Sequence, residues 1–86
     1  MIHRIFTVFD EKAGAFLLPF FAPSRGLAIR SFTETVNQPD HVFNKHPADF
    51  TLFALGTYDD SSAMFDLAET PESLGLAIEF LTQEKN

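Results

Sequence analysis

The first third of the chain alternates between two faces, and both faces carry large apolar side chains. Over residues 2–9 this alternation predicts a strand that is covered on both faces, or on one face by a partner. The turn at residues 10–14 contains a glycine, and the apolar run of residues 15–21 predicts a second strand, so the two form an antiparallel hairpin. Pro19 cannot donate a ladder hydrogen bond, so we expect it at a sheet edge or a bulge.

A helical period follows over residues 24–37. The apolar positions of this segment fall on one side, and they are Leu27, Ala28, Ile29, Phe32 and Val36. Ser24 is a suitable N-cap, and Asn37 precedes Gln38-Pro39, where a helix is expected to stop. The next segment, residues 38–50, has two prolines and two histidines, and we expect a long loop there with one helical turn near residues 40–44.

The second half of the chain has the pattern of β structure. We predict strands over residues 50–57 and 63–68, joined by a turn at residues 58–62. For the C-terminal segment we predict a turn at residues 71–74 and a strand over residues 76–82, with a short terminal helix as the alternative. Thr82 and the residues after it should fray. The predicted fold is an α+β single small domain, an antiparallel β-sheet with one main helix packed on one face.

Length and composition limit the chain to one small core. The chain has 86 residues with 11 Phe and no Cys, so one domain without disulfides or thiolate metal sites is expected over residues 1–86. Neither a cleavable signal nor an apolar run of about 18 residues is visible, which favours a soluble intracellular protein.

The net charge of −6 is unevenly distributed. Residues 1–46 have a balance of +1, whereas residues 47–86 have a balance of −7. A chain with so few basic residues is a poor candidate for coating nucleic acid, because neutralising phosphates requires a concentrated Lys/Arg surface. A local basic face is still compatible with this composition, provided that the arginines and Lys12 converge in the fold.

Catalytic and metal-binding patterns are weak. His41 and His46, with Asp40 and Asp49, match no established metal-ligand spacing, so a pH-sensitive surface loop is favoured over a metal site. Asp59 and Asp60 fall in a predicted turn, where Asp is favoured by hydrogen bonds to its own backbone. The serines lack a nucleophile motif, and the chain has no phosphate-binding glycine loop. We therefore expect no catalytic residue, no metal and no cofactor.

Aromatic and basic residues near the proline-rich bend are the remaining candidates for a binding site. Phe20 and Phe21 immediately precede Pro23-Ser24-Arg25, so one ring is expected in the core and the other beside a guanidinium, an arrangement that suits base stacking. The more general explanation is that most of the phenylalanines are core residues. The candidate nucleic-acid or partner-binding residues are Arg4, Lys12, Phe20, Phe21, Arg25 and Arg30.

Three blocks of the chain carry a family resemblance. They are FTVFDEKAGAFLLPFFAPSRGLAIRSF, HPADFTLFALGTYDD and TPESLGLAIEF, which together extend from about Phe6 to Phe80. The chain resembles the small non-structural protein of gokushovirus-type microviruses, the open-reading-frame-five family of small single-stranded DNA phages. The resemblance implies a non-capsid accessory factor of the host cytoplasm, acting in single-stranded DNA synthesis or in the switch from replication to packaging. It supplies no catalytic residues.

Two hypotheses follow. In the first, the protein binds single-stranded DNA, or the phage replication initiator, through the candidate residues. In the second, it is a protein-interaction module that binds a viral or host protein without touching nucleic acid, which the acidic second half favours. A homodimer is expected under either hypothesis, because a lone helix leaves one sheet face uncovered. No membrane partner is expected.

Overall fold

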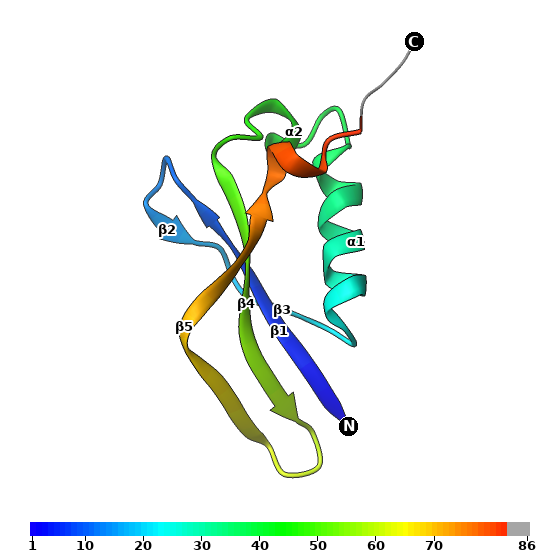
Figure 1. Ribbon diagram of the computed structural model, residues 1–86, viewed down its shortest axis with the longest axis vertical. Coiled ribbons are helices and arrows are strands. Elements are labelled where there is room, and N and C mark those ends of the chain that lie inside the picture. Colours follow the sequence, from blue (N-terminus) through cyan, green and yellow to red (C-terminus); the bar gives the residue numbers. More distant parts are fainter. Residues whose placement is uncertain (83–86) are drawn as a thin grey trace.

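The central strand of the fold is β1 (Ile2–Asp10), in a computed structural model that describes residues 1–82. β1 pairs with β4 (Phe50–Asp59) along one side and with two short strands, β2 (Ala15–Phe16) and β3 (Phe20–Ala22), along the other. β4 in turn pairs with β5 (Met64–Leu76), and every pairing is antiparallel. The long helix α1 (Arg25–Val36) lies against one face of this sheet (Figure 1). The predicted α+β fold, an antiparallel sheet with one main helix, is therefore confirmed.

The predicted second strand over residues 15–21 is divided in two. Both β2 and β3 pair with β1, but residues 17–19 between them are not part of a strand. Pro19 has no N–H group, and Leu17 bonds to two different strand positions: its N–H donates to the Val8 carbonyl at 2.8 Å, and its carbonyl accepts from the Thr7 hydroxyl at 2.6 Å. The predicted hairpin is thus confirmed, and its second arm is interrupted at residues 17–19, which end at the proline.

The helix predicted over residues 24–37 is confirmed as α1. The Ser24 side chain accepts a hydrogen bond from the Leu27 N–H at 3.1 Å, which satisfies one of the donors left free at a helix start. At the other end, the Asn37 side chain donates to the carbonyls of Thr33 and Phe80. The loop that follows contains a short second helix, α2 (Val42–Lys45), close to the predicted helical turn.

The C-terminal third differs from the prediction. β4 extends to Asp59, and β5 continues from Met64 to Leu76 through the segment where a turn at residues 71–74 was expected. Pro71 has no N–H group to donate to a neighbouring strand. β5 tolerates this because it is an edge strand, with a partner on one side only. The strand predicted over residues 76–82 is also wrong, because residues Ala77–Phe80 form a 3-10 helix, η1, close to the alternative of a terminal helix.

Long-range contacts explain why η1 forms in place of a strand. The Glu79 carboxylate accepts a hydrogen bond from the Leu76 N–H at 3.2 Å, and the Ile78 N–H donates to the Pro47 carbonyl at 3.0 Å. The Phe80 ring packs edge-on against Phe32 of α1 at 5.6 Å. Thr82, which was expected to fray, bonds to the Asn37 side chain through both its N–H and its hydroxyl. The rest of the expected frayed tail, residues 83–86, lies outside the described residues.

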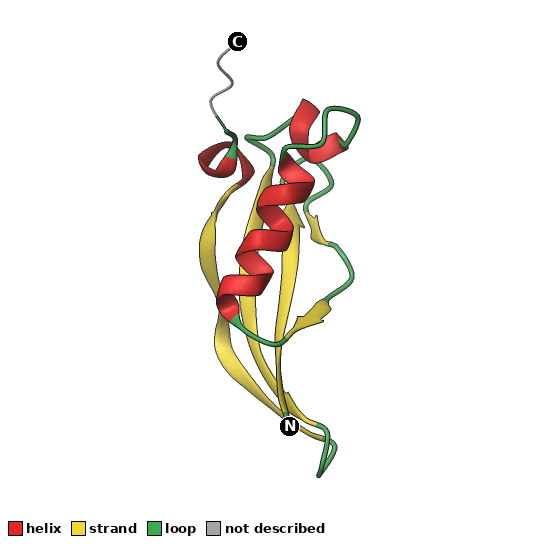
Figure 2. Cartoon of the chain, turned by 90° about the vertical axis from the view of Figure 1, so that its right-hand side faces the viewer, coloured by secondary structure: helices red, strands yellow, loops and turns green. Residues whose placement is uncertain are grey.

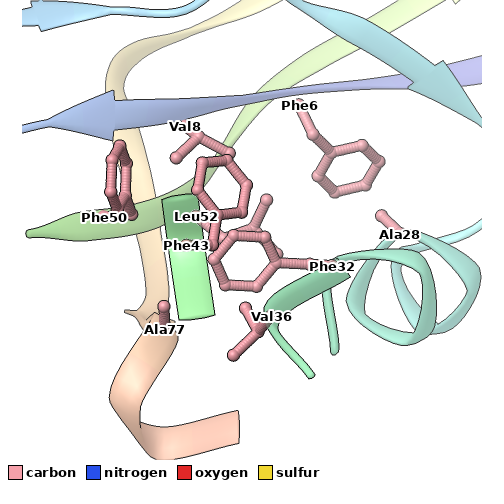
Figure 3. Close-up of a cluster of buried hydrophobic side chains, with 9 residues drawn as sticks. All are labelled: Phe6, Val8, Ala28, Phe32, Val36, Phe43, Phe50, Leu52 and Ala77. Atoms are coloured by element: carbon pink, nitrogen blue, oxygen red, sulfur yellow. The ribbon is translucent and has the colours of Figure 1, made fainter. Parts of the chain in front are cut away.

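The core lies between the sheet and the helices. Ala28, Phe32 and Val36 lie four positions apart in α1, so they share one face of the helix and are buried against the sheet. Figure 3 shows these side chains meeting those of β1 and β4, with Phe43 of α2 and Ala77 of η1 closing one end. Buried residues from the strands in this cluster are Phe6, Val8, Phe50 and Leu52. One compact cluster therefore joins all the helical elements to one face of the sheet.

Bulges bend the two long hairpin strands. The register between β4 and β5 shifts between Leu52 and Phe53 and again between Ala54 and Gly56. Gly56 has a φ of 153°, and a Cβ at this position would collide with the Asp66 carbonyl oxygen and lie 2.8 Å from the Leu67 Cα. Only glycine fits here, because the neighbouring strand approaches the backbone directly.

We predict that Leu52→Ala lowers the free energy of unfolding by about 2–5 kcal/mol, because Leu52 is fully buried and the smaller side chain leaves a cavity. The matched control is Leu27→Ala in α1, where the side chain is half exposed and the loss should stay below about 1 kcal/mol. Urea unfolding followed by circular dichroism measures both, and equal losses would contradict the core described above.

We predict that Gly56→Ala lowers the free energy of unfolding by about 3 kcal/mol or more, because backbone strain and the collision with β5 add together. Gly14→Ala is the control. Gly14 also has positive φ, at 66°, but no neighbouring atom lies within 4 Å of an added Cβ, so a loss of about 1–2 kcal/mol is expected there. A Gly56→Ala variant as stable as Gly14→Ala in the same urea titration would show that β5 does not approach β4 this closely.

Candidate functional site

The sheet face opposite α1 carries several large apolar side chains that are about half exposed. Figure 2 views the molecule from the side of α1, and Figure 1 shows that the helices lie on that side of the sheet. We call the opposite side the open face. Its side chains alternate with the core residues of each strand, and they are His3, Ile5, Thr7, Phe9, Phe16, Phe21, Thr51, Phe53, Leu55, Tyr58, Phe65, Leu67, Pro71 and Ser73. Ile5 and Thr7, in the middle of this face, are already buried by their neighbours.

Four rings form a continuous cluster at one end of the open face, which we call the His3 cluster. The Tyr58 ring lies 4.7 Å from Phe65 and 5.9 Å from Phe21, and His3 lies 6.4 Å from both Phe21 and Tyr58. Phe21 and Phe65 are 52% and 55% exposed, so about half of each large apolar side chain faces solvent. The cluster is built by cross-strand pairing, since Tyr58 lies opposite His3 on one side and Phe65 on the other.

Three further rings form the Phe9 cluster, farther along β1. Phe9 and Phe16 lie opposite each other on β1 and β2 with ring centres 4.8 Å apart, and Phe16 meets Phe53 at 5.5 Å. Beside them is a shallow apolar hollow, lined by Thr7, Phe16, Leu17, Pro19, Leu55 and Pro71. The six positions from His3 to Phe9 correspond to about 20 Å, so the two clusters extend along much of the sheet.

The basic residues predicted as a binding site lie elsewhere. Arg4 alternates with the open-face residues of β1 and lines a pocket on the other face of the sheet together with Arg25 and Glu72. The Arg25 guanidinium forms an ion pair with the Glu72 carboxylate, Nη2 to Oε1, at 2.7 Å. The structure thus brings Arg4 and Arg25 to one pocket, but it also pairs Arg25 with an acidic side chain of the second half.

The remaining two basic candidates are separate from this pair. Arg30 lies on the exposed side of α1, and its Nε is 3.4 Å from the Glu34 carboxylate one turn further along. Lys12 lies in the turn that joins β1 and β2, eight positions or about 26 Å along the chain from Arg4. The four basic side chains therefore do not form one continuous face.

The two phenylalanines before the helix point to opposite faces of the sheet. Phe20 stacks on Phe6 at 5.8 Å and packs against the core, whereas Phe21 belongs to the open face. The expectation that one ring enters the core while the other is exposed is correct. The exposed ring neighbours His3 and Tyr58, and Arg25 is on the other side of the sheet.

Sequence reasoning missed most of the open face. Phe16, Phe53, Tyr58 and Phe65 were not chosen as site residues, because each belongs to an apolar segment that also suits a core strand. One signal was present in β1, where His3, Ile5, Thr7 and Phe9 form a second largely apolar face. Which of the two faces the helix covers is decided by the tertiary structure.

The polar clusters have structural roles. The Asp59 carboxylate accepts hydrogen bonds from the N–H and the hydroxyl of Ser61, the local bonding expected of Asp in a turn, and these bonds lower the pKa of Asp59. The His41 ring nitrogen accepts from the Phe43 N–H at 3.1 Å and so caps α2.

Within residues 1–82, no three His, Cys, Asp or Glu side chains gather closely enough to hold a metal ion. None of the helices in this part of the chain has the length and apolar character needed to cross a membrane.

Asp60 joins the hairpin turn to the edge of the open face. Its carboxylate accepts a hydrogen bond from the Met1 amino group at 2.8 Å and lies 2.8 Å from His3 Nε2. These bonds favour the ionised carboxylate, so the pKa of Asp60 is lowered, first by the amino group and then by His3. The contact with Asp60 also fixes the His3 ring within its cluster.

The fold and the surface together define a small two-layer α+β protein with an exposed aromatic sheet face. The chain belongs to the family described as phage ORF5 protein, whose model matches residues 3–80. No curated protein and no solved structure matches the chain. The family match covers every strand of the sheet and the main helix.

We predict that His3→Phe raises the pKa of Asp60 toward its ordinary value of 3.8, because the variant keeps a ring in the cluster but loses the hydrogen bond. A lowered pKa in the folded state means that Asp60 contributes stability above pH 3.8, and that this contribution is lost as the pH falls through the folded value. The wild type should therefore lose more stability than His3→Phe below pH 3.8. NMR titration of the Asp60 carboxyl checks the pKa, and an unchanged value in the variant would contradict the contact.

Proposed function

We propose that this phage protein is a non-enzymatic accessory factor whose open face is a protein-docking surface. One observation carries the proposal: the exposed aromatic rings lie on one side of the sheet, while Arg4 and Arg25 lie on the other. A surface that binds single-stranded nucleic acid combines stacking rings with cations that follow the phosphates. Here the two components are on different faces.

The charges of the chain support a protein partner. The aromatic rings of the open face carry no charge, and the imidazole of His3 is already bonded to Asp60. On the other side of the molecule, Arg25 and Arg30 each have a carboxylate partner. With a net charge of −6, the chain as a whole repels a polyanion.

The apolar character of the face supports the same conclusion. Phe21, Phe65 and Leu67 are each more than half exposed, and Phe21 of β3 and Phe65 of β5 both contact the Tyr58 ring of β4. Contiguous exposed apolar surface of this kind marks interaction sites in soluble proteins. Aromatic residues are also enriched at the centres of protein interfaces, where they supply large buried area.

In the infection cycle we place this docking activity in the host cytoplasm, in single-stranded DNA synthesis or in the switch from replication to packaging. The family match supports a phage protein, and the finer role follows from the resemblance to the non-structural proteins of microviruses. The phage replication initiator is one protein that such a module would serve. No chemical step is assigned to the chain.

Direct binding of single-stranded DNA is the second candidate, and one observation favours it. The rings of Phe21, Tyr58 and Phe65 form an exposed row on a sheet, and base stacking on an aromatic ring contributes about 1–3 kcal/mol per base. Under this alternative, Arg4 or Lys12 would have to reach the phosphates from outside the open face.

A salt titration separates the two candidates. We predict that fluorescence anisotropy of a labelled single-stranded oligonucleotide shows no binding at about 100 mM salt, because the aromatic face lacks cations. Binding that weakens steeply with salt, and whose salt dependence flattens in Arg4→Ala or Lys12→Ala, would favour the DNA candidate and contradict the proposal.

Site-specific photo-crosslinking tests the protein partner directly. A benzophenone amino acid at Phe65 should form an adduct with protein during infection, whereas the same group at Ile78 is the control. Both positions are about half exposed, and Ile78 lies in η1, away from the open face. Equal adducts at the two positions, or none at Phe65, would count against docking through the open face.

A further inference from the structure

We propose that the protein docked on the open face is a second copy of this chain, so that the working unit is a twofold dimer. This inference rests on the proposed function, since it names the partner of the same surface. In such a dimer the two sheets stack face to face about 10 Å apart, with one α1 on each outer side. The interface is isologous, so each open face meets the same surface of its partner.

The elongated shape of one chain supports a dimer in which a second copy supplies the layer that the single chain lacks on its open face. The radius of gyration is 13.7 Å, whereas a compact domain of 86 residues is expected at about 12 Å. The principal extents are 48 × 27 × 18 Å, so the molecule is long and thin, with one helical layer on one sheet. Stacking two open faces would thicken the molecule along the direction in which α1 lies on the sheet (Figure 1), and it would bury the side of the sheet that lacks a helix.

The size of the open face is sufficient for a specific dimer. β1 and β4 have 9 and 10 residues, which gives a length of about 30 Å at about 3.3 Å per residue. Four strands at spacings of about 4.8 Å give a width of about 15–19 Å, so the face of each copy has a projected area of about 500 Å². Side-chain relief increases this area, and the already buried Ile5 and Thr7 reduce it. Two copies bury about 1,000 Å² in total, the lower bound for a specific interface.

The uncharged rings of the open face favour an identical face, rather than a charged protein, as the partner. A cationic or anionic protein would place charged groups against apolar rings that offer no counter-charge, and such burial is unfavourable. A second copy brings an open face with the same uncharged rings. The net charge of −6 on each chain lies outside this surface, so two copies repel each other at long range, and added salt should strengthen the dimer.

Pairing through the edges of the sheet is less favourable. β5 is the exposed edge strand, and it carries Pro71 together with the acidic residues Asp66, Glu69 and Glu72. Proline and charged side chains on an edge strand prevent another strand from adding to it. At the opposite edge, β2 and β3 are short and are interrupted at residues 17–19. The open face is therefore the favoured route of self-association.

Sedimentation equilibrium of the full chain tests the dimer. We expect the wild type to have twice the mass of one chain at micromolar concentrations, and a dimer dissociation constant that decreases between about 50 and 500 mM NaCl. Phe65→Glu should raise that constant at least tenfold, because it places a charge among the apolar rings of the interface. Ile78→Glu is matched in exposure and should leave the constant unchanged.

Circular dichroism of each variant separates dissociation from unfolding. If Phe65→Glu does not fold, Leu67→Glu replaces it, since Leu67 is on the same face and 60% exposed. A wild type that stays monomeric at every concentration would overturn the inference. A dimer that survives both open-face variants, or that Ile78→Glu dissociates, would overturn it too, because the interface would then be elsewhere.

The outcomes also distinguish this inference from the proposed function. A monomer that still crosslinks through Phe65 to a different protein overturns the dimer and leaves the docking function supported. A monomer that forms no protein adduct through the open face contradicts both. A dimer disrupted by Phe65→Glu, with an adduct at Phe65 of twice the mass of one chain, supports both.

Discussion

The packing of α1 against one face of the sheet is the interaction on which the rest of the structure depends. Three buried side chains of the helix, Ala28, Phe32 and Val36, insert over Phe6 and its neighbours in β1 and β4. A helix of 12 residues is about 18 Å long, so α1 covers only part of one face of strands that extend for about 30 Å, and it does not reach the opposite face. Because α2 and η1 also join this cluster, the helical elements are all on the same side of the sheet. The open face follows directly from that one-sided packing.

The bulges in β4 and β5 give the open face its pattern. Gly56 lets β5 approach closely, and the register shifts on either side of Ala54 place Tyr58 opposite Phe65 and Gly56 opposite Leu67. Cross-strand neighbours on one face pack together, so these pairings bring into contact rings that are distant in sequence. The same irregular strand positions Glu72 on the other face, where its carboxylate meets Arg25.

The arginines and the exposed aromatic rings are therefore on opposite sides of the sheet. The arginines of the first half are on or near the helix side and interact with carboxylates, while the open face contains rings and aliphatic groups. This division is what makes protein docking the best-supported function for a chain of this family. It also explains why an overall charge of −6 need not prevent self-association, since the charge is largely outside the surface that would be buried.

The sequence by itself determined the local elements and the fold class. The strand over residues 2–9, the hairpin that follows it and the helix beginning at Ser24 depend on side-chain period, glycine and capping, which act within a few residues. For Phe20 and Phe21 the sequence raised the possibility of opposite sides, and the structure decided it. Only the tertiary structure decided that β5 continues past Pro71, that Ala77–Phe80 turn into a helix, and which face of β1 is covered. These features depend on contacts such as Arg25 with Glu72, 47 positions apart, and Asn37 with Phe80, 43 positions apart. No local pattern records such contacts, because they form only after the strands have paired.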